Sequence, residues 1–265
     1  MLHIYRRMWQ VNWAEQWQYR ANLLMYLLFW IVSPIVYLAV WTTIASDQGS
    51  VNGLTSNDFV TYYLTLLIVD NLVSQITIHI LAYKIQDGTL SGELLKPVHP
   101  IFTTTLVNNI AFKVLTWMLL APVWVILYLL FQPDYSGVTP LTLLLAVPAI
   151  VIGFGINFLL GAVITCVAFW TTRVYALNEL YSAMFILLGG LFVPLDLMPP
   201  LVRLIAQFLP FQLPVYFPIQ LILGKLSPER IALNFALGVA WLLFSLVLFL
   251  WIWRNGVRRF SAVGA

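Results

Sequence analysis

The stretch KIQDGTLSGELLKPVHP, from Lys84 to Pro100, separates two long apolar segments of this chain. It begins with a turn dipeptide, Asp87-Gly88, and the prolines at its far end limit helix formation. Between these points the sequence predicts a short element that carries an apolar pair, Leu94-Leu95, flanked by charged residues. Two interpretations remain open for this loop: a docking element for a soluble partner, and an ordinary connection between helices.

Composition places the chain among polytopic membrane proteins. Of its 265 residues, 62% are hydrophobic and 9% are charged, whereas soluble domains contain about 25% charged residues. No polar stretch reaches the length of a domain, so residues 1–265 are expected to form a single transmembrane domain. The net charge of +3 does not indicate nucleic-acid binding, and the single cysteine, Cys166, excludes a disulfide within the chain.

The first 20 residues carry too many charges to span a membrane. Trp9, Trp13 and Trp17 recur every four residues, which places them on one face of a helix. A tryptophan-rich amphipathic helix just before an apolar segment is typical of the membrane headgroup region. We therefore expect an interfacial helix at residues 1–20, with a soluble cap helix as the alternative.

The apolar segments predict an all-α membrane protein with six transmembrane helices, at about 22–44, 58–83, 104–131, 140–170, 174–193 and 231–253. The Lys and Arg residues indicate its orientation, because these residues are enriched in cytoplasmic loops. With both termini cytoplasmic, only Arg203, Lys225 and Arg230 lie outside, and the other ten of the thirteen lie inside. The first two outer loops then contain neither Lys nor Arg.

Residues 194–228 are apolar but contain seven of the 14 prolines. A segment broken in this way cannot form one straight span, and it would be poorly solvated as a free loop. We expect two short helices, at 201–209 and 218–226, that dip into the outer leaflet and are sheltered by protein. The alternative is a pair of further short spans, which would bring the total to eight.

The second apolar segment is the most polar of the six. Asp70 lies about 12 residues, or about 18 Å, inside it, and an acid in mid-membrane costs about 2.5–3.5 kcal/mol on insertion scales. Such a residue is expected to face a protein interior or a water-filled path. We therefore predict that the polar residues of this segment line a substrate route, with structural hydrogen bonds between helices as the alternative: Asp70, Asn71, Ser74 and Gln75.

Two further features concern the third and fourth apolar segments. Lys113 lies near the start of the third, where a lysine is expected to extend its ammonium group to the inner surface. The fourth contains small side chains that allow neighbouring helices to pack closely, namely Gly153, Gly155, Gly161 and Ala162.

No motif indicates an enzyme or a cofactor site. The chain lacks the GxxxxGK[ST] pattern of a P-loop, and it contains neither HExxH nor GxSxG. Its three histidines, His3, His79 and His99, do not have the spacing of metal ligands. We therefore expect no catalytic residue, no metal site and no bound cofactor in this chain.

Two stretches, NWAEQWQYR at Asn12–Arg20 and IQDGTLSGELLKPVHP at Ile85–Pro100, resemble the permease subunit of ABC-2-type ATP-binding-cassette exporters. The resemblance covers essentially the whole chain. It is closest to the bacterial ABC-2 family transporter proteins of the drug-exporter or viologen-exporter branch, which implies a location in the bacterial plasma membrane.

This resemblance implies a set of partners and roles. Two permeases would pair, as a homodimer or a heterodimer, and each would bind a separate ATPase subunit that holds ATP and Mg²⁺. The loop after the second span would be the coupling helix that docks on this ATPase, through Gly88, Thr89, Leu90, Gly92, Glu93, Leu94 and Leu95. The second and fifth spans would line the substrate path.

The few polar residues of the fifth span favour export of a hydrophobic or amphiphilic small molecule. Export of lipid or polysaccharide by the same machinery is the nearest alternative. An ATP-independent secondary transporter, a membrane-embedded enzyme and a passive assembly subunit are further alternatives. Only the exporter requires a stoichiometric ATPase.

Overall fold

The computed structural model describes Arg7, residues 9–11, 13–14, 17–18 and 20–75, and residues 77–260. This part of the chain is helical and contains no β-strand; its only β pairing is an isolated bridge between Val51 and Leu54. Most of the predicted interfacial helix at residues 1–20 lies outside the described residues. Its described positions are helical, and Trp13 packs against Phe112 and Leu115.

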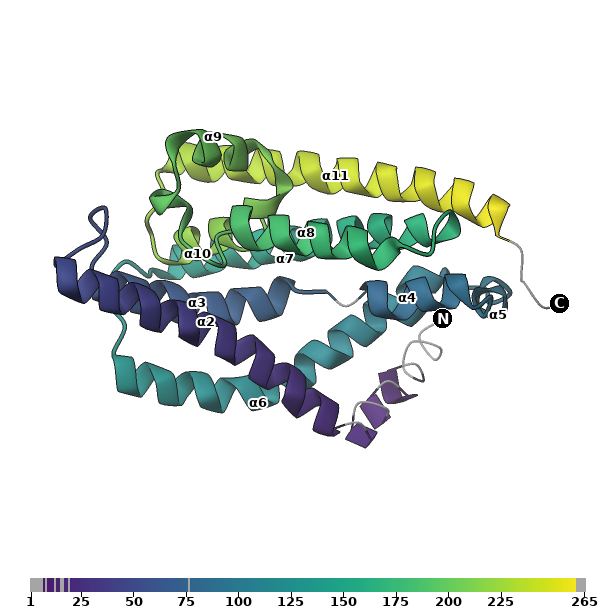
Figure 1. The fold of residues 1–265 in the computed structure, drawn as a ribbon, viewed down its shortest axis with the longest axis horizontal. Coiled ribbons are helices and arrows are strands. Elements are labelled where there is room, and N and C mark those ends of the chain that lie inside the picture. Colours follow the sequence, from purple (N-terminus) through teal and green to yellow (C-terminus); the bar gives the residue numbers. More distant parts are fainter. Residues whose placement is uncertain are drawn as a thin grey trace.

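The helices pack into an elongated bundle (Figure 1). In chain order the elements are α2 (Arg20–Gln48), α3 (Ser56–Val73), α4 (Thr77–Gln86), α5 (Leu90–Leu94), the π-helical turn η1 (Ile101–Leu106), α6 (Val107–Phe131), α7 (Pro140–Cys166), η2 (Val167–Phe169), α8 (Val174–Leu188), η3 (Leu195–Leu197), α9 (Pro200–Phe208), η4 (Pro210–Gln212), α10 (Tyr216–Ile222) and α11 (Pro228–Arg259).

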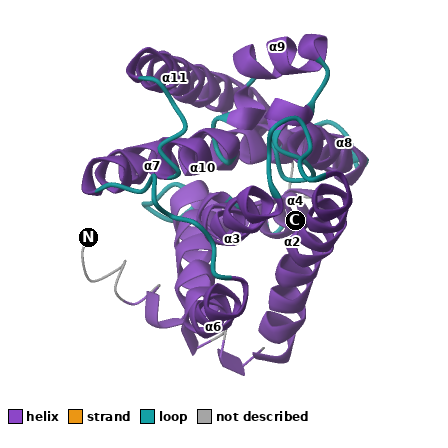
Figure 2. Ribbon diagram, turned by 90° about the vertical axis from the view of Figure 1, so that its left-hand side faces the viewer, coloured by secondary structure: helices purple, strands orange, loops and turns teal. Residues whose placement is uncertain are grey.

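Helix α3 lies in the middle of the bundle. It packs against α2, α6, α7 and α10, and most of its residues are buried, from Phe59 to Val73. Viewed along the bundle, α3 appears between α2, α6 and α7 (Figure 2). Helix α7 packs along α11 and also contacts α3 and α4. It therefore joins α11 to the helices of the second predicted span.

The connecting segments collect at two ends of the bundle. At the α9 end, Asn52 donates a hydrogen bond to the Asp196 carbonyl, and Lys225 pairs with Asp58. At the α5 end, Gln86 donates to the Thr172 carbonyl. The chain therefore returns repeatedly from one end to the other (Figure 1).

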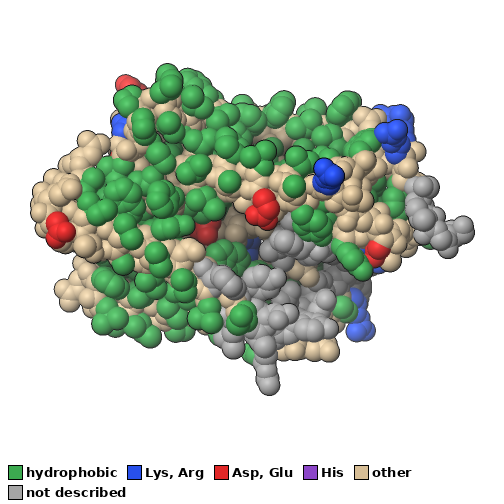
Figure 3. Space-filling view, in the orientation of Figure 1, with side chains coloured by type: hydrophobic (Ala, Val, Ile, Leu, Met, Phe, Trp, Pro, Cys, Tyr) green, Lys and Arg blue, Asp and Glu red, His purple; other side chains and the backbone are tan. Residues whose placement is uncertain are grey.

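Four helices are long and apolar enough to cross a membrane among the residues that the structure describes: Trp30–Gln48, Val107–Phe131, Pro140–Phe169 and Pro228–Arg259. They correspond to the first, third, fourth and sixth predicted spans. The fifth is the shorter helix α8. Hydrophobic side chains cover much of the molecular face seen in Figure 3, as a lipid-facing surface requires.

The proline-rich segment forms two short helices, as predicted. They are α9 (Pro200–Phe208) and α10 (Tyr216–Ile222), close to the expected ranges of 201–209 and 218–226. Most of α10 is buried against α7, whereas Leu201 and Phe208 of α9 are exposed.

The small residues of α7 allow close approach, as predicted. A Cβ atom added at Gly153 would lie 2.7 Å from the Cα atom of Pro214, and one at Gly155 would lie 2.7 Å from a methyl carbon of Leu242. Ala162 is fully buried. The backbone of the segment before α10 therefore rests directly on α7.

Candidate functional site

The second predicted span is not one continuous helix. Helix α3 ends at Val73, the backbone at Ser74 is extended with ψ 157°, and α4 begins at Thr77. The prediction of an unbroken helix over 58–83 was therefore wrong. An interruption inside an apolar bundle leaves main-chain carbonyls without helical partners, and each of these needs another donor.

Lys113 of α6 supplies donors to this break. Its Nζ atom lies 2.6 Å from the main-chain oxygens of both Asn71 and Ser74, and 3.2 Å from the Ser74 hydroxyl. The ammonium group also lies 5.2 Å from the centre of the Phe154 ring. The prediction that Lys113 extends to the inner surface was wrong, because the carbonyls at the end of α3 attract the cation inward.

Helices α7 and α8 supply further hydrogen bonds at the break. Asn157 of α7 donates from Nδ2 to the Val73 carbonyl at 2.9 Å, and it accepts a hydrogen bond at Oδ1 from the Tyr181 hydroxyl at 2.7 Å. Tyr181 belongs to α8. Side chains from three other helices therefore hold the end of α3 in place.

A cavity of about 320 Å³ lies beside this break. Its wall is formed by α2, α3, α7 and α8 together with residues at the break. The lining residues are Trp30, Ser33, Pro34, Tyr37, Leu66, Asp70, Ser74, Gln75, Asn157, Asn178, Tyr181, Ser182, Phe185, Ile186 and Leu191. Eight of the fifteen are aromatic or aliphatic and seven are polar or charged, so the cavity combines apolar walls with polar groups, as small-molecule sites do.

Three of the four predicted path residues line this cavity, namely Asp70, Ser74 and Gln75. Asn71 does not. Its Nδ2 atom donates to the Thr116 hydroxyl at 3.4 Å, on the side of α3 that faces α6. Three of the residues thus face a cavity, and the fourth makes a hydrogen bond between helices.

Sequence reasoning missed the aromatic residues of the wall. Trp30 and Tyr37 belong to α2, and Tyr181 and Phe185 belong to α8. In the sequence, nothing distinguishes these four residues from other aromatic residues in apolar helices. The polar residues Asn178 and Ser182, within a mostly apolar helix, were the local signals available in α8.

At the α5 end, the loop from Lys84 to Pro100 has a defined local structure. The Asp87 carboxylate accepts hydrogen bonds from the main-chain N–H and the hydroxyl of Thr89, at 3.0 and 2.7 Å. Gly88 has a φ of +83°, which a residue with a side chain rarely adopts. The predicted turn at Asp87-Gly88 is therefore present, and it leads directly into α5.

An ion-pair network holds α5 against α4. The Glu93 carboxylate lies 3.0 Å from the ammonium groups of both Lys84 and Lys96. Partial burial tends to raise the pKa of Glu93, but the hydrogen bonds from Lys96 and Lys84 outweigh it and hold the pKa below its ordinary value. Glu93 thus stabilises the loop.

The apolar residues of α5 divide between the interior and the surface. Leu90 is fully buried among α4, α7 and α11 residues, and Leu94 packs at the edge of the same cluster. The side chain of Leu95, just after α5, is 88% exposed. Thr89 and Gly92 are also exposed. The predicted Leu94-Leu95 pair is therefore presented mainly by Leu95.

The end of the loop rests on α11. The His99 ring lies 4.6 Å from the ring of Trp253 and 6.0 Å from that of Phe249, measured between centroids. Burial against these rings lowers the pKa of His99. The loop is thus held at both ends, by Gln86 against the α7–α8 connection and by His99 against α11.

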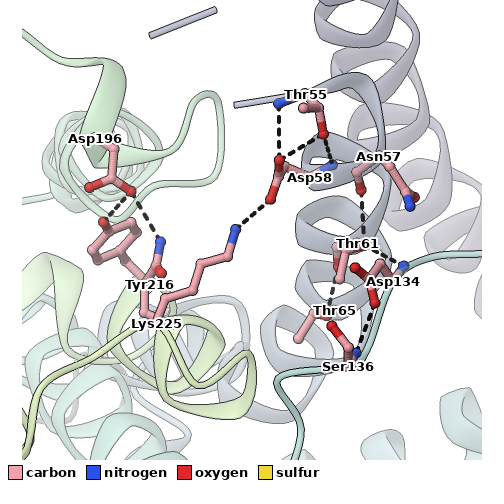
Figure 4. A network of polar contacts seen from close by, with 11 residues as sticks. Thr55, Asn57, Asp58, Thr61, Thr65, Asp134, Ser136, Asp196, Tyr216 and Lys225 are labelled. Atoms are coloured by element: carbon pink, nitrogen blue, oxygen red, sulfur yellow. Dashed lines mark hydrogen bonds and ion pairs between the residues drawn. The ribbon is translucent and has the colours of Figure 1, made fainter. Parts of the chain in front are cut away.

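At the α9 end, a polar network closes the bundle (Figure 4). Asp58 forms a capping box with Thr55 at the start of α3, and its carboxylate lies 2.8 Å from the ammonium group of Lys225. Nearby, the Asp196 carboxylate accepts hydrogen bonds from the Tyr216 hydroxyl at 2.7 Å and the Gln220 amide at 3.2 Å. In the described residues, no group of three His, Cys, Asp or Glu side chains is placed to hold a metal ion.

The family model described as "ABC-2 family transporter protein" matches residues 21–264. The chain belongs to this family. Membership agrees with the bundle of long apolar helices and extends over both the cavity and the α5 loop. A comparison with curated proteins gives no significant match.

As an ABC-2 family transporter protein, the chain is a multi-pass membrane component of a transporter. Members of this family typically lack ATPase motifs and generally pair with an ATPase.

Proposed function

We propose that this chain is the permease subunit of an ATP-driven exporter, working with a separate ATPase subunit and a second permease. The transported molecule is hydrophobic or amphiphilic and small, and the membrane is the bacterial plasma membrane. The observation that carries the proposal is the exposed Leu95 beside a braced α5, in a chain of the ABC-2 family.

The proposal includes six membrane crossings. The four long apolar helices make four of them, the α3–α4 pair makes one, and α8 makes one. An interrupted helix is acceptable inside a membrane when other protein groups bind its free carbonyls, as Lys113 and Asn157 do here. Helices α9 and α10 then form a re-entrant segment in the outer leaflet, and residues 1–20 lie at the inner interface.

The charges support an orientation with the α5 end in the cytoplasm. The basic residues near this end are Lys84, Lys96, Arg173, Arg254, Arg258 and Arg259, whereas the α9 end carries Arg203, Lys225 and Arg230. On the face shown in Figure 3, Lys and Arg side chains lie mostly toward the α5 end. Cytoplasmic loops of membrane proteins carry such an excess of basic residues.

In this orientation α5 is the coupling helix. Leu95 is the apolar group available to enter a groove of the ATPase, and Thr89 and Gly92 flank it on the exposed side. Leu90, Leu94 and Glu93 contribute by holding α5 in place. Exposed leucine next to a rigid element suits docking, because little conformational freedom is lost on binding.

The loop also connects α5 mechanically to the cavity through α4. Lys84, the last basic residue of α4, pairs with Glu93 of α5, so the two short helices are joined as one unit. Helix α4 leads directly to the break at Ser74, and Ser74 lines the cavity. We propose that movement of α5 by the ATPase turns α4 about this break and reshapes the cavity.

The test is co-purification with the cognate ABC ATPase after co-expression. Leu95→Glu should abolish recovery of the complex, as should charging Leu94 and Leu95 together, while the protein still elutes as a single species. Leu95→Met is the matched control, since it keeps an apolar side chain of similar volume, and it should leave recovery unchanged.

Unchanged complex recovery with Leu95→Glu would refute the docking role. Solute movement by the purified chain in liposomes, with no ATPase and no nucleotide present, would refute the exporter and favour a secondary transporter.

A further inference from the structure

The cavity beside the helix break combines aromatic walls with a single charge. Trp30, Tyr37, Tyr181 and Phe185 contribute four aromatic rings to its lining. Asp70 is the only charged residue among the lining groups that the structure describes. Its volume of about 320 Å³ falls within the range of about 300–1,000 Å³ that is common for small-molecule pockets.

The Asp70 carboxylate has no hydrogen-bond or ion-pair partner within the described part of the chain. This differs from the other acidic side chains that are partly buried in the described part of the chain. Asp58 pairs with Lys225, Glu93 with two lysines, and Asp196 accepts two side-chain hydrogen bonds. A carboxylate without a partner at this depth is costly, and a cation in the cavity would offset that cost.

Among the described residues, Lys113 is the cation that acts electrostatically on Asp70, but it is not one of the residues that line the cavity. Its three short contacts are with the main-chain oxygens of Asn71 and Ser74 and with the Ser74 hydroxyl. These contacts occupy the donors of the ammonium group. Asp70 therefore lines the cavity, whereas the ammonium group of Lys113 is bound to the end of α3.

The aromatic rings favour the same kind of ligand. The face of an aromatic ring attracts cations, and several rings around one site bind ammonium groups that carry apolar substituents. Removing water from such groups costs less free energy than removing it from a metal ion or a primary ammonium, which suits a pocket with aromatic walls. The amides of Asn157 and Asn178 add polar contacts without adding charge.

We propose that this cavity is a binding site for a monovalent organic cation, an ammonium group with apolar or aromatic substituents, and that Asp70 is its counter-ion. This inference rests on the proposed function and names the class of molecule that the exporter carries. The aromatic residues of α2 and α8 surround the cation, and neutral or anionic molecules of the same size bind less well.

Binding to the purified full-length chain in maltoside detergent, measured by calorimetry, tests the proposal. The probe is benzyltrimethylammonium, compared with phenethyl alcohol as a neutral molecule and benzenesulfonate as an anion. The wild-type chain should bind the cation at least about tenfold more tightly than the other two, a difference of about 1.4 kcal/mol.

Asp70→Asn keeps the shape of the side chain and removes its charge, so it should abolish the preference for the cation. Asp47→Asn is the matched control, because it removes the same charge from an exposed position at the end of α2. It should leave the preference unchanged. Trp30→Leu should weaken binding of the cation, and Trp30→Phe, which keeps an aromatic face, should restore most of it.

Equal binding of the three probes by the wild-type chain would overturn the proposal, whether or not the Asp70→Asn protein folds. A cation preference that survives in folded Asp70→Asn would also overturn it. These measurements use neither ATPase nor nucleotide. Their failure is therefore distinct from the failure of the proposed function, which is judged by recovery of the ATPase complex.

Discussion

The ammonium nitrogen of Lys113 lies 2.6 Å from the main-chain oxygen of Ser74, 39 residues away in the chain. A lysine inside an apolar bundle and an interrupted helix are each unfavourable alone. Together they compensate, because the lysine donates to the carbonyls that the interruption leaves free. This contact joins α6 to the end of α3 and so to the wall of the cavity.

Replacing Lys113 by Met should strongly destabilise the protein. The change removes the donors to the carbonyls of Asn71 and Ser74, and each buried group left unpaired costs about 1–3 kcal/mol. Thermal unfolding in detergent, followed by the loss of the monodisperse elution peak, measures the effect. A variant as stable as the wild type would show that water or lipid satisfies these carbonyls instead.

Replacing Lys225 by Met should have a much smaller effect on the same measurement. Its ion pair with Asp58 is partly exposed at the α9 end, and exposed pairs contribute about 0–1 kcal/mol. The loss should shrink further at high salt, since salt screens exposed charges. A destabilisation as large as that of Lys113→Met would mean that the α9 end limits the stability of the whole bundle.

Replacing Gly153 by Ala should destabilise the contact between α7 and the segment before α10. The added Cβ atom would lie 2.7 Å from the Cα atom of Pro214, and backbone cannot give way as a side chain can. Overpacking of this kind costs about 1–3 kcal/mol. The thermal midpoint in detergent is the measurement.

Gly92→Ala is the matched control for this change. No atom lies within 4 Å of a Cβ added at Gly92, which is in helix α5. Alanine favours helix over glycine by about 0.5–1 kcal/mol, so this variant should be neutral or slightly stabilised. Equal loss of stability in both variants would argue against the close approach at Pro214.

The stability of the α5 loop should fall as the pH decreases below about 6.5, the ordinary pKa of histidine. Burial lowers the pKa of His99 in the folded loop, so the unfolded loop binds more protons in this pH range. The stabilisation is complete above the ordinary histidine pKa and declines as the pH falls below it. Glu93, whose pKa is below its ordinary value, stays ionised throughout.

Hydrogen exchange of the amides at residues 84–100, corrected for the intrinsic effect of pH, measures this change. Exchange should accelerate on acidification in the wild type and much less in His99→Gln, which cannot titrate. An identical pH dependence in both proteins would assign the effect to a group other than His99.

Hydropathy and residue spacing along the chain were enough to predict much of this architecture. The four long apolar helices, the two short helices after Pro194, the turn at Asp87-Gly88 and the close packing at Gly153 all follow from local patterns. Each depends on the solvation or the backbone freedom of residues that are near one another in sequence. Three cavity residues were also found in this way, because a polar group in an apolar segment is conspicuous.

The break in the second segment, the inward position of Lys113 and the aromatic wall were decided by packing between distant parts of the chain. Hydropathy alone favours a continuous helix through Ser74 and a lysine that extends to the surface. The outcome changes because Lys113 and Asn157, on two other helices, reach the same free carbonyls. A hydrogen bond between residues 39 or 84 positions apart leaves no periodic trace in the sequence, so only the folded arrangement of α3, α6, α7 and α8 brings the site together.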